Sequence, residues 1–326
     1  MPDNGDDDTV LLTPRVSPPA VSAPVQPGRV RGRGGWLLAG VVVLGLGGAF
    51  WATRQGPGQA TDSRGPVVAH VPPAPPAVPA APTILLMERE ALLAWQPAET
   101  TLLRLADRPA VFVIAFPDLA RQGRMMNRLA AFIEKARTPR DRLLDDAALA
   151  AAIAEEGLEP ETYYLGHDYS LADVERFFAL ARSSGVALNA EERWLEARLP
   201  AIGSGAAGGP RAIITLPAES SGFDASARRA VLEHEAGHGL YFTDPAFAAQ
   251  VLRAWREVFA EADREAFRRF LKGEGYDTSQ EWLMANEAMA YLVFTPDTRF
   301  FDPARDLGLD AAAAERLRAA MRPAPR

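Results

Sequence analysis

The sequence predicts an α+β domain that is mostly helical and contains a small sheet. Helical periodicity and capping residues recur along most of the chain after residue 83. Two short runs, 110–116 (AVFVIAF) and 212–216 (AIITL), instead have the unbroken apolar composition of buried strands. With 326 residues, of which 48% are hydrophobic, the chain is long enough to bury a sizeable core.

The helices are predicted, in chain order, from apolar periodicity and from residues that can cap a first turn. Two starts are clear: Ser170 with Asp173 three residues on, and Asn189 with Glu192, which is a capping-box arrangement. The predicted helices are 84–95, 119–136, 170–181, one opened by Asn189, one capped by Asp224 or Ser226, 245–271 and 279–294.

Three segments precede this domain, which is expected to occupy residues 84–326. Residues 1–35 are polar and contain several prolines, so they predict a disordered tail. Residues 36–53 contain the uncharged run WLLAGVVVLGLGGAFW, with a tryptophan at each end, and predict a transmembrane anchor. Residues 54–83 are rich in proline and alanine and predict a semi-extended linker.

The distribution of charge around the apolar run predicts the orientation of the anchor. Four arginines precede the run and two follow it closely, which places the tail in the cytoplasm. We therefore expect a single-pass protein of a bacterial inner membrane whose C-terminal domain faces the periplasm. A cleaved signal peptide is the alternative, although its n-region is usually far shorter than 35 residues.

Composition also excludes several classes of site. The chain has no cysteine, so disulfides and cysteine-based zinc sites are excluded, and a zinc site must use histidine and carboxylate ligands. The formal net charge of −7 gives no basic surface of the kind that binds nucleic acid.

The most specific signal is His234-Glu235-Ala236-Gly237-His238, an HExxH motif. Histidines four residues apart project from one face of a helix and can share a single metal ion. The glutamate between them lies beside that ion, where it can take a proton from a metal-bound water. The motif therefore predicts a hydrolytic site with Zn²⁺ as its cofactor.

Two histidines leave a catalytic zinc site one protein ligand short. Glu287 is the preferred third ligand because it is the only charge in 283–294 (LMANEAMAYLVF), and a buried carboxylate is costly unless a cation neutralises it. A salt bridge to a buried arginine is the alternative role for Glu287. Asp244 and His167 are alternative ligands, but the Asp-Pro pair at 244 is more simply a helix N-cap followed by a first-turn proline.

An HExxH motif followed on a later helix by an Asn-Glu pair, Asn286 and Glu287, resembles the gluzincin branch of the zincin metallopeptidases. The resemblance covers residues 212–294. It implies a catalytic glutamate within the motif and an upstream edge strand that aligns a peptide. The zinc ligands that it implies are His234, His238 and Glu287.

Tyr291 marks a departure from that family. It stands four residues after Glu287, where thermolysin-like members have an aspartate that supports the histidines. One helical turn from Glu287 on the same face, its hydroxyl can donate to an oxyanion or to a ligand. Tyr291 is therefore the second predicted catalytic residue beside Glu235, with a purely packed aromatic as the alternative. His167 and Tyr241 are further candidates for the donor.

Together these observations predict a membrane-anchored, zinc-dependent peptidase that hydrolyses peptide or protein substrates with Glu235 as general base. The alternative is a non-catalytic zincin-fold domain that binds a peptide or an envelope partner, although the intact Glu235 favours the enzyme. Metal-dependent hydrolysis of a bond other than a peptide is consistent with the same motif. The sequence identifies neither the specificity pocket nor the oligomeric state.

Overall fold

The computed structural model describes residues 84–203 and 208–324. The predicted tail, anchor and linker, residues 1–35, 36–53 and 54–83, lie outside the described residues. Among the helices of the described part, none combines the length and apolar character required to cross a membrane.

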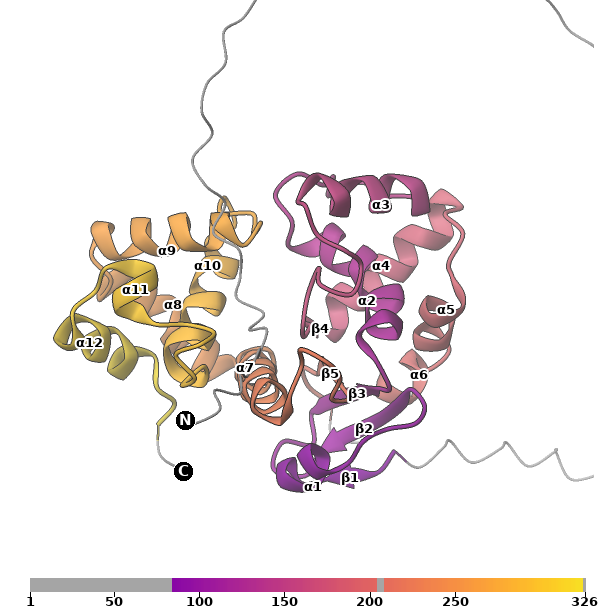
Figure 1. Cartoon of the computed structure of the whole chain (residues 1–326), viewed down its shortest axis with the longest axis horizontal. Helices are drawn as coiled ribbons and strands as arrows, with labels where there is room; N and C mark the ends of the chain where they lie inside the picture. The colour runs from indigo at the N-terminus through magenta and orange to yellow at the C-terminus, as the bar shows by residue number, and fades with distance from the viewer. Residues whose placement is uncertain (1–83, 204–207, 325–326) are drawn as a thin grey trace, which may run out of the picture. The chain divides into compact units, whose positions relative to one another are not determined.

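A five-stranded mixed sheet is formed by strands between residues 86 and 217 (Figure 1). Its spatial order is β1-β2-β3-β5-β4. The β1–β2 and β3–β5 pairs are parallel, and the β2–β3 and β4–β5 pairs are antiparallel, which makes β4 an antiparallel edge strand. The strands are β1 (Leu86–Met87), β2 (Thr101–Leu105), β3 (Val111–Phe116), β4 (Asp168–Ser170) and β5 (Ala212–Pro217).

The two predicted strands are confirmed as β3 and β5, the paired central strands of the sheet. Every residue of both strands is buried, because helices cover both faces of the sheet, and this explains their unbroken apolar sequences. One face packs against α2 (Leu119–Ile133) and α4 (Leu171–Ser184). The other packs against α7 (Ala225–Thr243), the helix that carries the HExxH motif.

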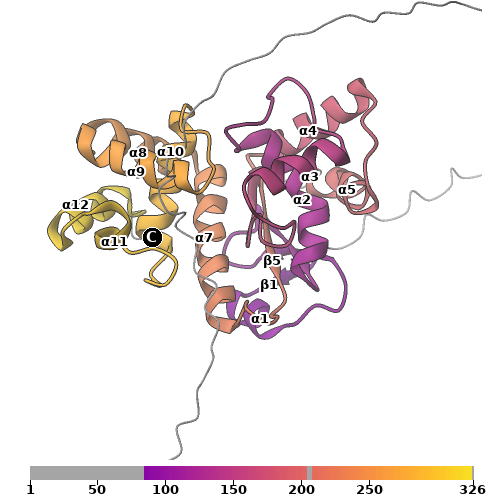
Figure 2. The same cartoon turned by 45° about the horizontal axis from the view of Figure 1, so that its top comes forward.

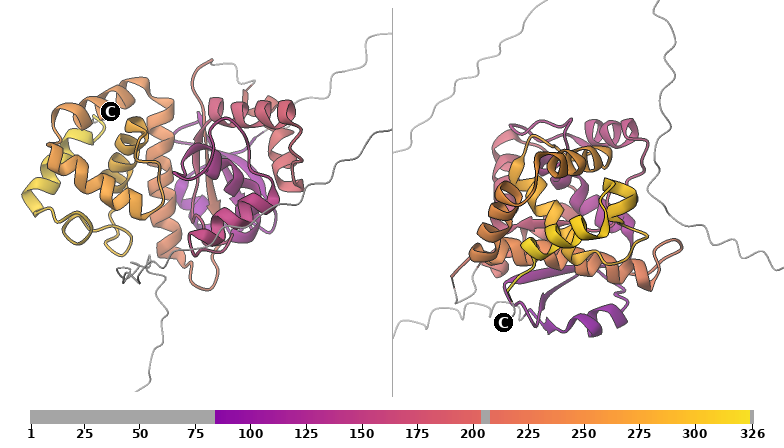
Figure 3. Two further views of the ribbon diagram at one scale, coloured as in Figure 1. Left: turned by 90° about the horizontal axis from the view of Figure 1, so that it is seen from above. Right: turned by 90° about the vertical axis from the view of Figure 1, so that its left-hand side faces the viewer.

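Helix α7 runs between the sheet half of the domain and a group of C-terminal helices (Figures 2 and 3). Trp255, Phe267 and Leu271 are completely buried in the core of that group. The expectation of a mostly helical α+β domain with a small sheet is therefore confirmed. The remaining helices are α1 (Arg89–Ala94), α3 (Asp146–Glu155), α5 (Ala190–Glu196), α6 (Leu199–Gly203), α8 (Pro245–Glu257), α9 (Glu261–Gly273), α10 (Glu281–Met289), the π-helix η1 (Ala290–Phe294), α11 (Pro303–Leu307) and α12 (Ala311–Met321).

The predicted caps are confirmed. Ser170 Oγ accepts from the Asp173 amide at 3.1 Å, and the reciprocal Asn189–Glu192 hydrogen bonds of the capping box are both 2.8 Å long. Of the two candidates for the start of α7, Asp224 is the cap, since its Oδ1 accepts from an amide in the first turn at 2.7 Å. These side chains satisfy amides that have no partner within their helices.

Two predicted helices are wrong in extent. The segment 84–95 contains β1 as well as the short α1, because Leu86 and Met87 pair with β2. The segment 245–271 is divided between α8 and α9, since Phe259 turns into the core between the rings of Trp255 and Phe267. Strands β2 and β4 and helices α3, α6, α11 and α12 were not predicted.

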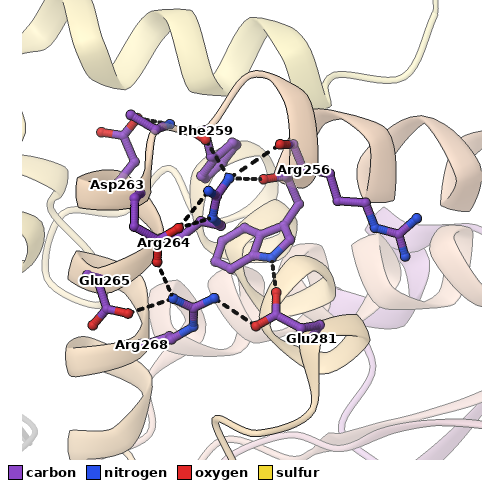
Figure 4. Close-up of polar contacts among 10 residues, drawn as sticks. Arg256, Phe259, Asp263, Arg264, Glu265, Arg268 and Glu281 are labelled. Carbon is purple, nitrogen blue, oxygen red and sulfur yellow. Dashed lines mark hydrogen bonds and ion pairs between the residues drawn. The ribbon is translucent and has the colours of Figure 1, made fainter.

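A polar network connects α8, α9 and α10 (Figure 4). Glu281, the first residue of α10, accepts from Trp255 Nε1 and from Arg268 Nη2, both at 2.7 Å. Arg264 donates to the main-chain carbonyls of Trp255 at 3.0 Å and Phe259 at 2.6 Å, which are left free where α8 ends. The network fixes the start of α10, and Glu287 lies six residues further along that helix.

Candidate metal centre

Two glycines allow α7 to approach its neighbours closely. A Cβ atom at Gly239 would lie 2.9 Å from Val111 Cγ1 of β3, and one at Gly237 would lie 2.6 Å from the Phe294 ring. Both distances are shorter than ordinary van der Waals contact, so a side chain at either position would push the helix away. The motif helix is therefore held tightly between the sheet and η1.

The three predicted metal ligands come together from two helices. His234 Nε2 lies 3.1 Å from His238 Nε2, and Glu287 Oε2 lies 3.9 Å from the first and 3.8 Å from the second. Ligand atoms at zinc distances in a tetrahedral site are roughly 3.4 Å apart. The three atoms thus form a triangle of the size that one zinc ion requires.

The chemistry of this donor set also fits a metal. Glu287 is only 1% exposed, and its Oε2 has no hydrogen-bond partner in the described part of the chain. Burial, with repulsion from Glu134 and Glu235, holds the pKa of Glu287 well above its usual 4.5. A buried carboxylate of this kind is stable in its charged form only when a cation compensates it.

Burial acts on the histidines in the opposite direction. It lowers the pKa of His234 well below its usual 6.5, with repulsion from His238 adding to the effect. It lowers the pKa of His238 to about 4, although a polar contact with Asn286 partly counteracts it. Both imidazoles are consequently neutral at pH 7, and each has one nitrogen lone pair free for a metal.

Thr295 fixes the orientation of His234. The Thr295 hydroxyl donates to the carbonyl of Ala290 at 3.0 Å, so its oxygen acts as the acceptor for His234 Nδ1, 2.7 Å away. The hydrogen-bond network therefore assigns the imidazole hydrogen to Nδ1 and directs the Nε2 lone pair towards the other ligands. Thr295 follows directly after η1, and its side chain bonds the carbonyl of the first residue of that π-helix.

Replacing Thr295 by valine is expected to weaken zinc binding about 10- to 100-fold, because the nearly isosteric side chain cannot accept from His234. Competition with a chromogenic chelator measures the dissociation constant. Thr243→Val is the matched control, since that hydroxyl bonds the Gly239 carbonyl on the same helix at 2.6 Å and does not involve a histidine ring. Equal losses in the two variants would contradict the assignment.

Glu235, the predicted general base, is 5% exposed, and its Oε2 has no hydrogen-bond partner in the described chain. Burial, together with repulsion from Glu134, raises the pKa of this carboxyl to about 8, and a hydrogen bond with Asp168 partly opposes the rise. Gly166 lies directly against the same side chain, because a Cβ atom there would overlap with Glu235 Oε1. The carboxylate is thus confined beside the metal ligands.

The other four residues named from the sequence lie in different settings. The Tyr291 ring lies against His234, with 4.9 Å between ring centroids, and is packed between Phe270 and Phe301. His167 is buried, with its Nδ1 3.0 Å from the Tyr169 hydroxyl. The Asp244 side chain caps α8, as expected. The Tyr241 ring belongs to the C-terminal core.

Sequence reasoning missed Asp168 and Thr295. Asp168 begins β4 and, with Glu235 and His238, forms a second group of buried atoms that lie within 4.8 Å of one another. The adjacent His167 was the only feature in the sequence that pointed to this segment. Thr295 had no local signal, because it lies 61 residues from the histidine that it contacts.

Glu134 is a further buried carboxyl near the site. Burial raises its pKa to about 7, while a polar contact with Tyr164 and the charge of Lys135 oppose the rise. Because the folded protein binds this proton more tightly than the unfolded chain, its contribution to stability is lost as pH rises from about 4.5 through 7.

Glu134→Gln is therefore expected to stabilise the protein at pH 8 by on the order of 1–3 kcal/mol, with a much smaller effect at pH 4.5. Denaturant unfolding of the chelator-treated protein at both pH values measures the difference. Glu155→Gln, at an exposed position of α3, is the control. An equal effect of Glu134→Gln at both pH values would contradict the raised pKa.

Comparison of the chain with protein-family models, with curated proteins and with solved structures found no match. The function must therefore be argued from the geometry of the site.

Proposed function

We propose that the protein is a zinc-dependent peptidase in which His234, His238 and Glu287 bind the metal and Glu235 is the general base. One observation carries the proposal: the three predicted ligand atoms, from helices α7 and α10, lie within 4 Å of one another, and the buried Glu287 Oε2 among them has no hydrogen-bond partner in the described chain. The chain's resemblance to the gluzincins at the motif and at the Asn-Glu pair is consistent with this role.

Zinc in such a site supplies Lewis acidity, which lowers the pKa of a water and polarises the carbonyl to be cleaved. Glu235 accepts the proton of the attacking water and returns it to the leaving nitrogen. Its buried position excludes bulk water, and its raised pKa of about 8 suits a group that must both take and release a proton near neutral pH.

The position of β4 supports a peptide as the substrate. It is an antiparallel edge strand, and it lies beside α7. An extended peptide can add to such an edge through main-chain hydrogen bonds. Tyr291, whose ring lies against His234, is the proposed donor to the oxyanion. The expected inner-membrane anchor at 36–53 and the periplasmic location belong to the same proposal and rest on the sequence alone.

Elemental analysis of the purified full-length protein beside its Glu287→Ala variant tests the metal site. We expect about one zinc per chain in the wild type and a loss or strong weakening in the variant. Full retention by the variant would remove Glu287 as a ligand. No zinc in the wild type, even after zinc is supplied, would favour the alternative of a non-catalytic binding domain.

A further inference from the structure

Asp168 lies in contact with the proposed site from an element that the metal ligands do not use. It is the first residue of edge strand β4 and pairs with Ile214 of β5. Its Oδ1 lies 3.6 Å from Nδ1 of His238, the nitrogen that faces away from the other ligands. The backbone of β4 therefore determines where this carboxylate meets the imidazole.

Asp168 and His238 are both buried, and burial favours a hydrogen bond between them. Asp168 is 8% exposed and lies near the buried carboxylates of Glu235 and Glu287, so its own burial is unfavourable unless a donor compensates it. His238 is completely buried, and its Nδ1 has no hydrogen-bond partner in the described chain. Glu235 also contacts Asp168, and Asn286 contacts His238, but neither contact provides an acceptor for the Nδ1 hydrogen of His238.

The tautomer of His238 follows from its metal-binding nitrogen. Its Nε2 is the atom 3.1 Å from His234 Nε2, so a neutral imidazole that binds the ion there carries its hydrogen on Nδ1, towards Asp168. The separation of 3.6 Å is an ion-pair distance that exceeds a hydrogen bond, so the bond requires the two side chains to approach more closely than they do in this structure. A carboxylate in this position fixes the ring and increases its basicity as a ligand.

We propose that Asp168 is the positioning residue of His238: its carboxylate accepts a hydrogen bond from Nδ1 and holds Nε2 towards the metal. This inference rests on the proposed zinc site. Asp168 itself is not one of the ligands in this arrangement, because it faces the opposite ring nitrogen. Thr295 and Asp168 then have equivalent roles, one for each histidine, and they come from opposite sides of α7.

The test compares Asp168→Asn and Asp168→Ala in the full-length protein. The zinc dissociation constant is expected to rise about 10- to 100-fold in Asp168→Ala and by less in Asp168→Asn, whose amide oxygen still accepts from Nδ1. The absorption spectrum of the cobalt-loaded protein should keep four-coordinate intensity in both variants. Asp141→Asn, at an exposed position, is the control and should match the wild type.

A merely structural Asp168 would give a different result. Removing an uncompensated buried charge would then stabilise the fold and leave zinc affinity unchanged in Asp168→Asn, and this outcome would overturn the proposal. Loss of zinc as complete as in Glu287→Ala would also overturn it, by making Asp168 a ligand. If Asp168→Ala does not fold, the near-isosteric Asp168→Asn decides between these outcomes. Absence of zinc from the wild type would overturn the proposed function itself, and the wild-type sample reveals it separately.

Discussion

Replacing Glu235 by glutamine is expected to lower peptide hydrolysis by about 10²- to 10⁴-fold while the protein retains its zinc. Glutamine preserves the size of the side chain but cannot accept the proton of the attacking water at neutral pH. The three ligand atoms belong to other residues, so the metal site itself should be unaffected. Mass spectrometry of a diverse mixture of unstructured peptides measures cleavage whatever the preferred sequence is.

Glu233→Gln provides a matched control two residues away on the same helix. Glu233 is half-buried and lines a surface cavity with residues of α1 and η1, away from the ligand atoms, so its substitution should leave activity unchanged. Normal hydrolysis by Glu235→Gln would show that another group is the base and would contradict the proposed mechanism. Loss of activity together with loss of zinc would show damage to the metal site instead.

The parts of the site that could be predicted are those determined by local spacing. Two histidines four residues apart must share a helix face, whatever the rest of the chain does. Glu287 could be predicted for an energetic reason, since a single carboxylate within an apolar helical segment requires compensation. The same local logic explains the correct helix caps, which depend on residues two or three positions apart.

The parts that could not be predicted depend on contacts distant in sequence. Strand β4 has three residues and no distinctive periodicity, and it exists because it pairs with β5. Asp168 therefore approaches His238 through a sheet register that no local pattern specifies. The interruption between α8 and α9 has the same origin. The apolar spacing of 245–271 is that of one continuous helix, but the chain is broken where Phe259 is buried in the core.

Tyr291 and Thr295 show that the support of His234 depends on contacts that local spacing does not reveal. In the structure, the Tyr291 ring contacts His234 directly, and Thr295, four residues further on, bonds to the same imidazole. The support of His234 thus comes from the π-helix η1, which contains Tyr291, and from Thr295, which follows it directly.

Gly166→Ala is expected to reduce activity by on the order of 100-fold, because a methyl group there would occupy the space of Glu235 Oε1 and would lie 2.7 Å from Val231 Cγ1. The proposed general base would have to move, whereas the three atoms nearest to the added methyl group belong to Glu235 and Val231 and not to a proposed zinc ligand. We therefore expect zinc content to stay near the wild-type value. Steady-state kinetics on the best cleaved peptide, with zinc analysis of the same sample, measure both quantities.

Gly273→Ala is the appropriate control, since a Cβ atom at that exposed helix end meets no other atom within 4 Å. Neither glycine has a positive φ angle, so the two substitutions differ in packing rather than in backbone strain. If Gly166→Ala retained full activity, the position of Glu235 would not depend on close contact with the segment before β4. Loss of activity with zinc retained would instead show that the segment before β4 positions the base. The binding of zinc would then depend on α7 and α10 and not on this segment.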